Sequence, residues 1–164
     1  MTDAIHVRRL PHLERLTVAG SLAFNDEGMA AVARLTRLQE FRTWHAGATQ
    51  EGVKKLKSLT NLKSLYLGQR LTYTPLACPN DDTLAIVAEM KSLESLQLDE
   101  ARLSFAALQR LRQLPALKKL TLGGIDIPPA DVERLKKELP TVKIEWTEPS
   151  EVYRKRIRAL FGGE

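Results

Sequence analysis

Few side chains in this sequence have the type and spacing that covalent or metal chemistry requires. His6, His12 and His45 are spread along the chain, and no cysteine or carboxylate stands at a metal-ligand spacing from them. The single cysteine, Cys78, has no neighbouring base in the sequence that would activate it as a nucleophile. Gly123-Gly124 lacks the lysine and hydroxyl residue of a phosphate-binding loop. We therefore expect no catalytic residue, no metal site and no cofactor.

Binding chemistry is better represented, by two large aromatic side chains in a chain with only 5% aromatic residues. Tryptophan, tyrosine and arginine are the residue types that dominate the energy of protein interfaces. Trp44 and Arg42 are close in sequence, whereas Tyr66 is 22 residues from Trp44. These side chains can act together only if the fold brings them together, so the elements that carry them decide the function.

A recurring phrase, Leu-x-x-Leu-x-Leu, defines those elements. Its first leucines stand 25, 24, 31 and 24 residues apart, at Leu13, Leu38, Leu62, Leu93 and Leu117; the copy at Leu38 is degenerate, with Phe41 and Thr43 in place of leucines. An apolar stripe with helical spacing follows each phrase, which predicts a helix packed against the strand leucines. The stripes are Met29, Val32 and Leu35; Val53, Leu56 and Leu59; Leu84, Val87 and Met90; Leu108, Leu111 and Leu114; and Val132, Leu135 and Leu139.

Helix starts recur in phase with these stripes. Four residues before each stripe stand Asn25, Thr49, Asn80, Ser104 and Pro128. The first four are preferred N-cap residues, and the pair Pro128-Pro129 suits a helix start because proline lacks only an amide that would be unpaired there. Each unit is therefore predicted to be a strand, a turn and a helix.

The pattern resembles the leucine-rich repeat family, in which each unit is a short strand plus a return segment. The resemblance implies an α/β fold, a right-handed solenoid with a parallel sheet on its concave face and helices on its convex face. We expect a single domain over residues 1–164, with about five repeats in 10–139 and a closing strand at 141–147 like that of bacterial members of the family. The ninth position, often Asn or Cys in this family, is occupied by Ser21, Ala46, Arg70, Ala101 and Ile125, which leaves the subclass and curvature open.

The C-terminal segment 150–161 is predicted to be a helix that caps the last repeat. Its apolar residues fall on one broad face at helical spacing: Val152, Tyr153, Ile157, Leu160 and Phe161. Arg154, Lys155 and Arg158 are expected to lie away from that face, with Ser150 as the N-cap. A basic amphipathic helix that docks on an anionic membrane or a partner would have the same pattern.

An insertion of about seven residues, relative to a 24-residue unit, interrupts the third unit between Gly68 and Pro79. Pro75 and Pro79 cannot donate to a sheet ladder, so we expect an irregular loop between strand and helix. Insertions in solenoids are often binding loops, and a tolerated surface loop is the alternative.

Strand side chains alternate, so the third, fifth and seventh positions of each phrase form columns on the concave face. These columns are Arg15, Glu40, Ser64, Ser95 and Lys119; Thr17, Arg42, Tyr66, Gln97 and Thr121; and Ala19, Trp44, Gly68, Asp99 and Gly123. Trp44 and Tyr66 fall in adjacent strands, and Gly68 beside Trp44 would leave room for an inserted side chain. Thr43 stands where a core leucine belongs, so a register slip that turns Trp44 inward is the alternative. The candidate partner-binding residues are Arg42, Trp44, His45, Tyr66, Gln97 and Asp99.

The resemblance implies a non-enzymatic module that binds a protein or peptide on the concave face. The net charge of +5 and the isoelectric point near 9.5 raise the alternative of a nucleic-acid or anionic-surface binder. Against nucleic acid, the concave columns offset Arg15, Arg42 and Lys119 with Glu40 and Asp99. A small enzyme that uses the loop at 69–79 is a third class.

The sequence has no signal peptide and no run long enough to span a membrane, which argues against a membrane partner. One cysteine excludes an intramolecular disulfide framework. Both observations favour a cytoplasmic location. The oligomeric state and the identity of the partner stay open.

Overall fold

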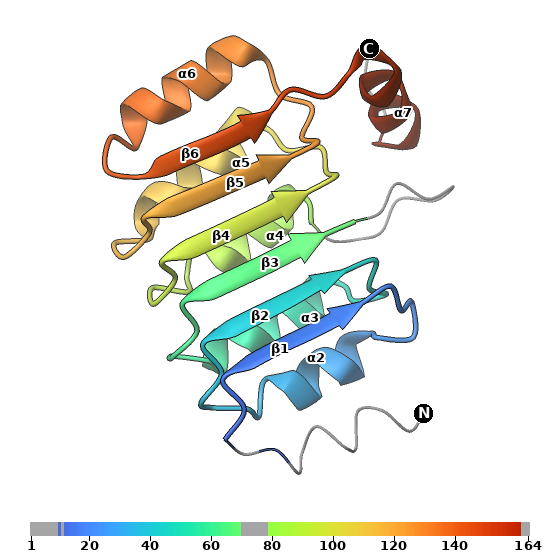
Figure 1. The fold of residues 1–164 in the computed structure, drawn as a ribbon, viewed down its shortest axis with the longest axis vertical. Coiled ribbons are helices and arrows are strands. Elements are labelled where there is room, and N and C mark those ends of the chain that lie inside the picture. Colours follow the sequence, from blue (N-terminus) through green and yellow to red (C-terminus); the bar gives the residue numbers. More distant parts are fainter. Residues whose placement is uncertain (1–9, 11, 70–78, 162–164) are drawn as a thin grey trace.

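Six parallel strands form one sheet in the computed structural model, which describes residue 10 and residues 12–69 and 79–161. The strands follow one another in chain order (Figure 1): β1 (Arg15–Ala19), β2 (Glu40–Trp44), β3 (Ser64–Gly68), β4 (Ser95–Asp99), β5 (Lys119–Gly123) and β6 (Lys143–Thr147). Equivalent repeat positions pair across every strand boundary, as in the row Leu65, Leu96 and Leu120. The predicted columns are therefore real columns, because the register never shifts.

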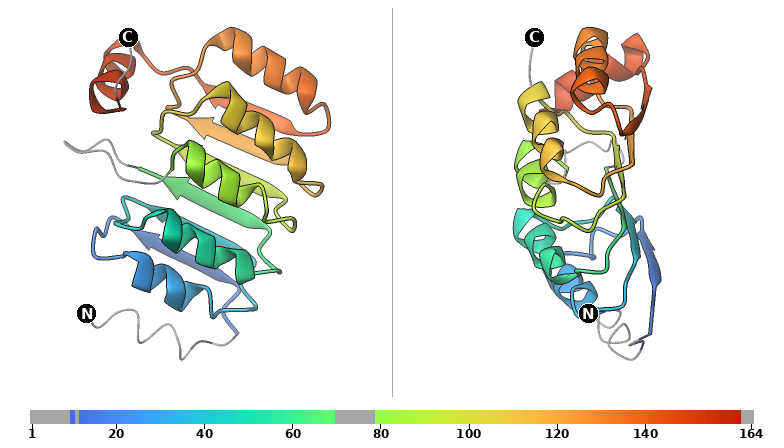
Figure 2. Two further views of the ribbon diagram at one scale, coloured as in Figure 1. Left: turned by 180° about the vertical axis from the view of Figure 1, so that it is seen from behind. Right: turned by 90° about the vertical axis from the view of Figure 1, so that its left-hand side faces the viewer.

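Helices cover one face of this sheet and leave the other, the concave face, bare (Figure 2). They are α2 (Asp26–Val32), α3 (Gln50–Lys55) with the 3₁₀ turn η1 (Leu56–Ser58), α4 (Asp81–Val87), α5 (Phe105–Gln109) with η2 (Arg110–Gln113) and α6 (Pro129–Glu138). A further helix, α7 (Glu151–Phe161), follows the last strand and is not part of this layer (Figure 1). The first five of these helices connect successive strands on the same side. This arrangement confirms the predicted α/β solenoid.

The core lies between the sheet and the helices. Every residue of the predicted helix stripes is at most 7% exposed, and the inward strand residues of the second to fifth units are at most 2% exposed. Full burial of such a side chain contributes roughly 1.5–3 kcal/mol. The first unit is less enclosed, because Leu13, Leu16 and Val18 are only partly buried and have no preceding repeat to pack against.

The degenerate second unit keeps its register. Thr43 faces the core at 2% exposure, and Trp44 therefore lies on the concave side, which removes the register-slip alternative. The Thr43 hydroxyl finds no hydrogen-bond partner among the described residues. An unsatisfied buried hydroxyl destabilises a core.

Replacing Thr43 by valine should therefore raise the free energy of unfolding by about 1 kcal/mol, because the methyl group keeps the shape and removes the unsatisfied group. Urea denaturation would measure the change. Thr17→Val, at an exposed concave position, is the matched control and should change stability by less than about 0.5 kcal/mol. A Thr43→Val protein less stable than wild type would show that the hydroxyl is hydrogen-bonded.

All five predicted helix starts are confirmed. The side chains of Asn25, Thr49, Asn80 and Ser104 each accept from a backbone amide of the first helical turn, and Asn80 forms a capping box with Thr83. Pro128 precedes α6, which begins at Pro129.

Two aspartates connect neighbouring helix starts, a role that no repeat pattern indicates. The Asp26 carboxylate accepts from both the backbone amide and the hydroxyl of Thr49, each at 2.7 Å. Asp81 accepts from the backbone amide of Ser104 at 2.8 Å. A bond of this kind cannot form between α5 and α6. Phe105, which is equivalent to Asp26 and Asp81, has no side-chain acceptor, and Pro128 has no amide to donate. The bonds of Asp26 and Asp81 therefore join the helix starts of neighbouring repeats.

Replacing Asp26 by alanine should lower the free energy of unfolding by about 1–2 kcal/mol at pH 7, because two hydrogen bonds between repeats disappear. Burial raises the pKa of the Asp26 carboxyl, but the bonds from Thr49 and the charge of Lys55 outweigh burial and lower it. The contribution of the ionised Asp26 side chain to stability is present above its unfolded-state pKa. It is lost as the pH falls through the lowered pKa of the folded state. The difference between variant and wild type should thus shrink below about pH 4. Asp82→Ala, which removes an exposed first-turn charge from α4, is the control. An equal loss in both variants would contradict the role of Asp26.

The C-terminal helix forms as predicted, but its contacts differ from the prediction. Ser150 accepts from the amide of Tyr153, as expected for the N-cap, and Ile157 is fully buried. Val152, however, is 82% exposed, so it does not belong to the docked face. Arg154 was expected to face solvent, yet its side chain is 11% exposed and pairs with the equally buried Asp126 at 2.8 Å. The side chain of Phe161 lies outside the described part of the chain.

α7 lies beside the carboxyl ends of the strands (Figure 1). The ring of Tyr153 packs over Gly124, and its hydroxyl is hydrogen-bonded to Glu100. Arg158 adds a second ion pair to Asp126, at 2.9 Å. α7 is therefore fastened to the loops that follow β4 and β5, and its role as a cap stays a prediction.

The insertion in the third unit is described only at its ends. Gln69 is buried, and its side-chain amide donates to the carbonyl of Pro79. Residues 70–78, on which the loop prediction depends, lie outside the described residues.

Candidate functional site

The candidate side chains lie on the concave face because burial alternates along each strand. In β2 and β4 the second and fourth residues are buried, and their neighbours are partly exposed on the uncovered side. The register places Arg42 beside Tyr66 and Tyr66 beside Gln97. Strand pairing thus assembles five of the six predicted residues: Arg42, Trp44, Tyr66, Gln97 and Asp99.

Trp44 and Tyr66 form a stacked pair, which we call the aromatic shelf. Their ring centroids are 5.5 Å apart with an interplanar angle of 30°. The guanidinium carbon of Arg42 lies 4.8 Å from the Tyr66 ring centroid, within cation–π distance. Both rings are partly buried, so the shelf is less exposed than a pair of isolated aromatic side chains.

The Tyr66 hydroxyl fixes the other end of the shelf. It donates to Asp99 at 2.6 Å, and the Gln97 side-chain amide donates to the same carboxylate at 3.1 Å. Burial, followed by the bond to Asp99 and its charge, raises the pKa of Tyr66 well above its usual value. The hydroxyl therefore stays protonated as a donor, and the shelf is held in one orientation.

Gly68 does not leave room for a partner side chain, contrary to the expectation. A Cβ at this position would lie 3.0 Å from the Tyr66 hydroxyl oxygen and 3.2 Å from the Trp44 Cβ. The space above Gly68 is already filled by the shelf. The glycine allows the two rings to approach the strand, and a partner has to bind above the rings.

His45 is placed differently from the other five residues. Its backbone is left-handed, with φ of 55°, and its amide donates to the carbonyl of Gly68. Its Nδ1 atom is buried without a hydrogen-bond partner in the described part of the chain. His45 shapes the end of β2, and no described side-chain hydrogen bond joins it to the shelf.

A hollow adjoins Asp99 at the carboxyl ends of β4, β5 and β6. We call it the acidic hollow. Its volume is about 280 Å³, and its lining includes Asp99, Glu100, Gly123, Gly124, Glu148 and Tyr153. Only Asp99 of this group was predicted. Sequence reasoning missed the hollow because Tyr153 comes from α7, whose position against the loops no repeat pattern reports.

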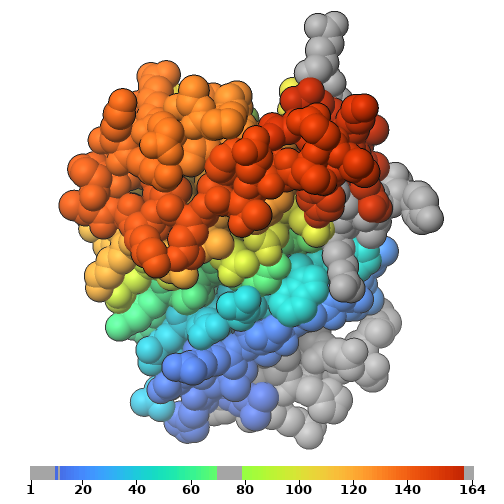
Figure 3. Space-filling model, turned by 45° about the horizontal axis from the view of Figure 1, so that its top comes forward, coloured from blue at the N-terminus to red at the C-terminus, as the bar shows by residue number. Residues whose placement is uncertain are grey.

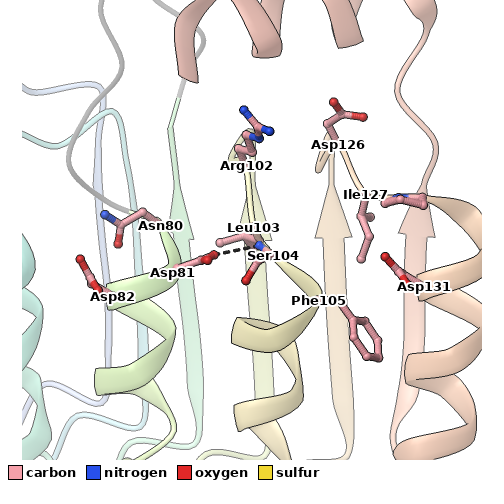
Figure 4. Close-up of a pocket in the computed structure, with 11 residues that line it drawn as sticks. Asn80, Asp81, Asp82, Arg102, Leu103, Ser104, Phe105, Asp126, Ile127 and Asp131 are labelled. Carbon is pink, nitrogen blue, oxygen red and sulfur yellow. Dashed lines mark hydrogen bonds between the residues drawn. The ribbon is translucent and has the colours of Figure 1, made fainter. Parts of the chain in front are cut away.

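Another hollow, of about 560 Å³, lies at the helix starts of α4, α5 and α6 (Figure 4). Two of its carboxylates are engaged within the protein, since Asp81 accepts from the Ser104 amide and Asp126 pairs with two arginines of α7. Within the described ranges no group of three or more potential ligands could hold a metal ion.

Two acids on the concave face each pair with two neighbouring basic side chains. Glu40 pairs with Arg15 and Arg42 at 3.8 and 3.9 Å, and Glu145 pairs with Lys119 and Lys143 at 2.9 and 2.7 Å. Hydrogen bonds from the two lysines lower the pKa of Glu145 to about 2. A nucleic-acid backbone needs one sign of charge on one face, and this face lacks it.

The sequence matches no protein-family model and no curated protein. The fold does resemble solved structures. A leucine-rich repeat protein of Leptospira interrogans is 20% identical, with a TM-score of 0.51 over 86% of this chain. An internalin (InlF) of Listeria monocytogenes is 18% identical, with a TM-score of 0.60 over 92% of this chain. In both comparisons the alignment spans 39% of the other chain, so the likeness concerns the fold of part of a larger molecule. Across the residues described, no helix has the length and apolar character needed to cross a membrane.

Proposed function

We propose that this leucine-rich repeat solenoid is a non-enzymatic module that binds a protein or peptide on its concave sheet face. The contact residues would be Arg42, Trp44, His45, Tyr66, Gln97 and Asp99. One observation carries the proposal: two stacked aromatic rings and an arginine lie on a face that none of the described helices covers. The likeness to leucine-rich repeat structures supports a protein-interaction role only at the level of the fold.

The shelf is suited to binding because it is already ordered. Trp44, Arg42 and Asp99 each hold Tyr66. Ordering a flexible side chain on binding costs roughly 0.5–1.5 kcal/mol, and little of that cost arises here. A partner would therefore gain most of the free energy of burying the exposed parts of the rings.

The rival functions have less support. The paired charges at the strand starts weigh against nucleic acid. Docking of α7 on an anionic membrane would have to release Arg154 and Arg158 from Asp126. The enzyme hypothesis depends on residues 70–78, outside the described chain. A cytoplasmic location is proposed from the single cysteine.

Photocross-linking tests which face binds. Peptides are first selected against the wild-type protein from a displayed library of random 12-residue sequences. A photoreactive benzoylphenylalanine is then placed either at Thr17, exposed on the concave side of the first repeat, or at Glu27, exposed on α2 of the same repeat. We expect the selected peptides to cross-link at Thr17 and not at Glu27. The reverse result, or a library that yields no binder, would contradict the proposal.

A further inference from the structure

We propose that the partner is a basic segment: it crosses the strands along their carboxyl ends, lays an apolar side chain on the aromatic shelf and places a lysine or arginine in the acidic hollow. The inference rests on the proposed function and adds the chemistry of the partner to it.

The shelf and the hollow form one continuous surface through Asp99. This carboxylate accepts the Tyr66 hydroxyl on the shelf side, and it lies over Gly123 on the other side, where a Cβ would collide with it. Gly123 and Gly124 form a floor without side chains next to the carboxylate. A side chain that leaves the shelf toward β5 therefore meets Asp99 first.

Charge divides the concave face along the strand direction. The strand starts carry the lysines and arginines that pair with Glu40 and Glu145. At the last position of each strand and the residue after it, in all six strands, there is no lysine or arginine, whereas Asp99, Glu100 and Glu148 occupy three of these positions. The carboxyl-end edge of this face is therefore acidic.

The arginines of α7 reduce this negative charge without cancelling it. Arg154 pairs with Asp126, Glu148 and Glu151, so a single guanidinium group forms ion pairs with three carboxylates. Arg158 pairs with Asp126, and Arg156 acts on Tyr153 through its charge. The described lining of the acidic hollow itself holds three acids, Asp99, Glu100 and Glu148, and no lysine or arginine. A cationic side chain is the complement of that excess.

The spacing of the strands sets the spacing within the partner. Two to three strand intervals of about 4.8 Å separate Trp44 on β2 from the hollow between β4 and β5, roughly 10–14 Å in total. An extended peptide advances about 3.4 Å per residue. The basic residue should therefore stand three or four positions from the apolar residue, in either chain direction. Figure 3 shows successive stretches of the chain as colour bands across this side of the molecule, from blue to red, with the C-terminal residues in dark red at the upper right.

The test uses the same random 12-residue library against the full chain. Selected sequences should be enriched in lysine or arginine three or four positions from an aromatic or large apolar residue. Asp99→Asn, which keeps the side-chain size and an oxygen acceptor for Tyr66, should weaken a selected peptide about tenfold. Replacing the basic residue of the peptide by glutamine should give the same loss, and the two losses should not add. Asp82→Asn, an exposed acid on α4, is the matched control and should leave the affinity unchanged.

A second variant avoids any change to the shelf. Thr147 is exposed at the end of β6 on the rim of the hollow. Thr147→Lys should supply the cation from within the protein and weaken the basic peptides about tenfold, with an unchanged melting temperature.

The outcomes separate the two proposals. Binders that need Trp44 and Tyr66, but carry no basic residue or are indifferent to Asp99→Asn and Thr147→Lys, would overturn this inference and leave the proposed function standing. Binders indifferent to Trp44 and Tyr66 would overturn both. A library without binders would count against both as well.

Discussion

Replacing Trp44 and Tyr66 together by alanine should weaken binding of a concave-face peptide by about 2 kcal/mol or more, roughly 30-fold. The two rings are the largest side chains of the candidate site, and each orients the other. Isothermal titration with a library-selected peptide would measure the change. The matched control is the pair Leu22→Ala and Val152→Ala, which removes two exposed apolar side chains at 56% and 82% exposure elsewhere on the surface.

The stability of the double variant should fall as well, by about 1–2 kcal/mol, because the rings are stacked and partly buried. This differs from the expectation for fully exposed aromatic side chains, whose loss would leave stability unchanged. Circular dichroism at the titration temperature must therefore show a folded protein. A folded double variant with wild-type affinity would remove the shelf from the binding site.

Replacing Asp126 by alanine should lower the free energy that holds α7 in place by about 3 kcal/mol. Asp126 is the shared partner of Arg154 and Arg158, and its removal leaves Arg154, at 11% exposure, without its most buried counter-charge. If the docking of α7 is worth less than this penalty, the helix detaches. Hydrogen exchange of the amides in residues 151–161 would then rise sharply.

Glu133→Ala is the control for this second prediction, because Glu133 pairs with Lys136 on the exposed side of α6. Exposed pairs of this kind contribute little, and the expected change is below about 0.5 kcal/mol. Protected α7 amides and an unchanged urea midpoint in Asp126→Ala would contradict the assigned role of the ion pair. Deleting residues 150–164 then asks whether α7 is a cap: a cap predicts a less stable or aggregating protein, and a partner-docking helix predicts an equally stable one.

The repeat pattern was sufficient to predict the backbone, as the second unit shows. Although Thr43 breaks the leucine pattern, β1 and β3 pair with β2 in the expected register on its two sides, and Trp44 stays on the concave face. The N-caps were equally readable, since Asn80 and Ser104 act on amides within three residues. N-caps depend on residues close in sequence, and strand register depends on a pattern that repeats at a nearly fixed period, so both can be predicted from the sequence.

Contacts between side chains far apart in sequence were not readable. Arg154 looked like a solvent-exposed charge, because nothing near it in the sequence reports that Asp126, 28 residues earlier, lies within 2.8 Å. Gly68 looked like an empty place, because the lean of Tyr66 over it depends on Asp99, 33 residues later. The left-handed backbone of His45 also has no sequence pattern, since that conformation is uncommon for residues other than glycine.

The tryptophan indole groups allow the most direct test of binding on the concave face. The chain has two tryptophans, and they face opposite sides of the sheet region: Trp44 lies on the shelf, whereas the indole of Trp146 donates to the carbonyl of Ile125 beneath it. An ¹⁵N–¹H correlation spectrum therefore contains one indole signal from each place. Titration with a library-selected peptide should shift the Trp44 indole signal and leave that of Trp146 unchanged. A bound peptide that shifts only the Trp146 signal, or neither, would contradict binding at the aromatic shelf.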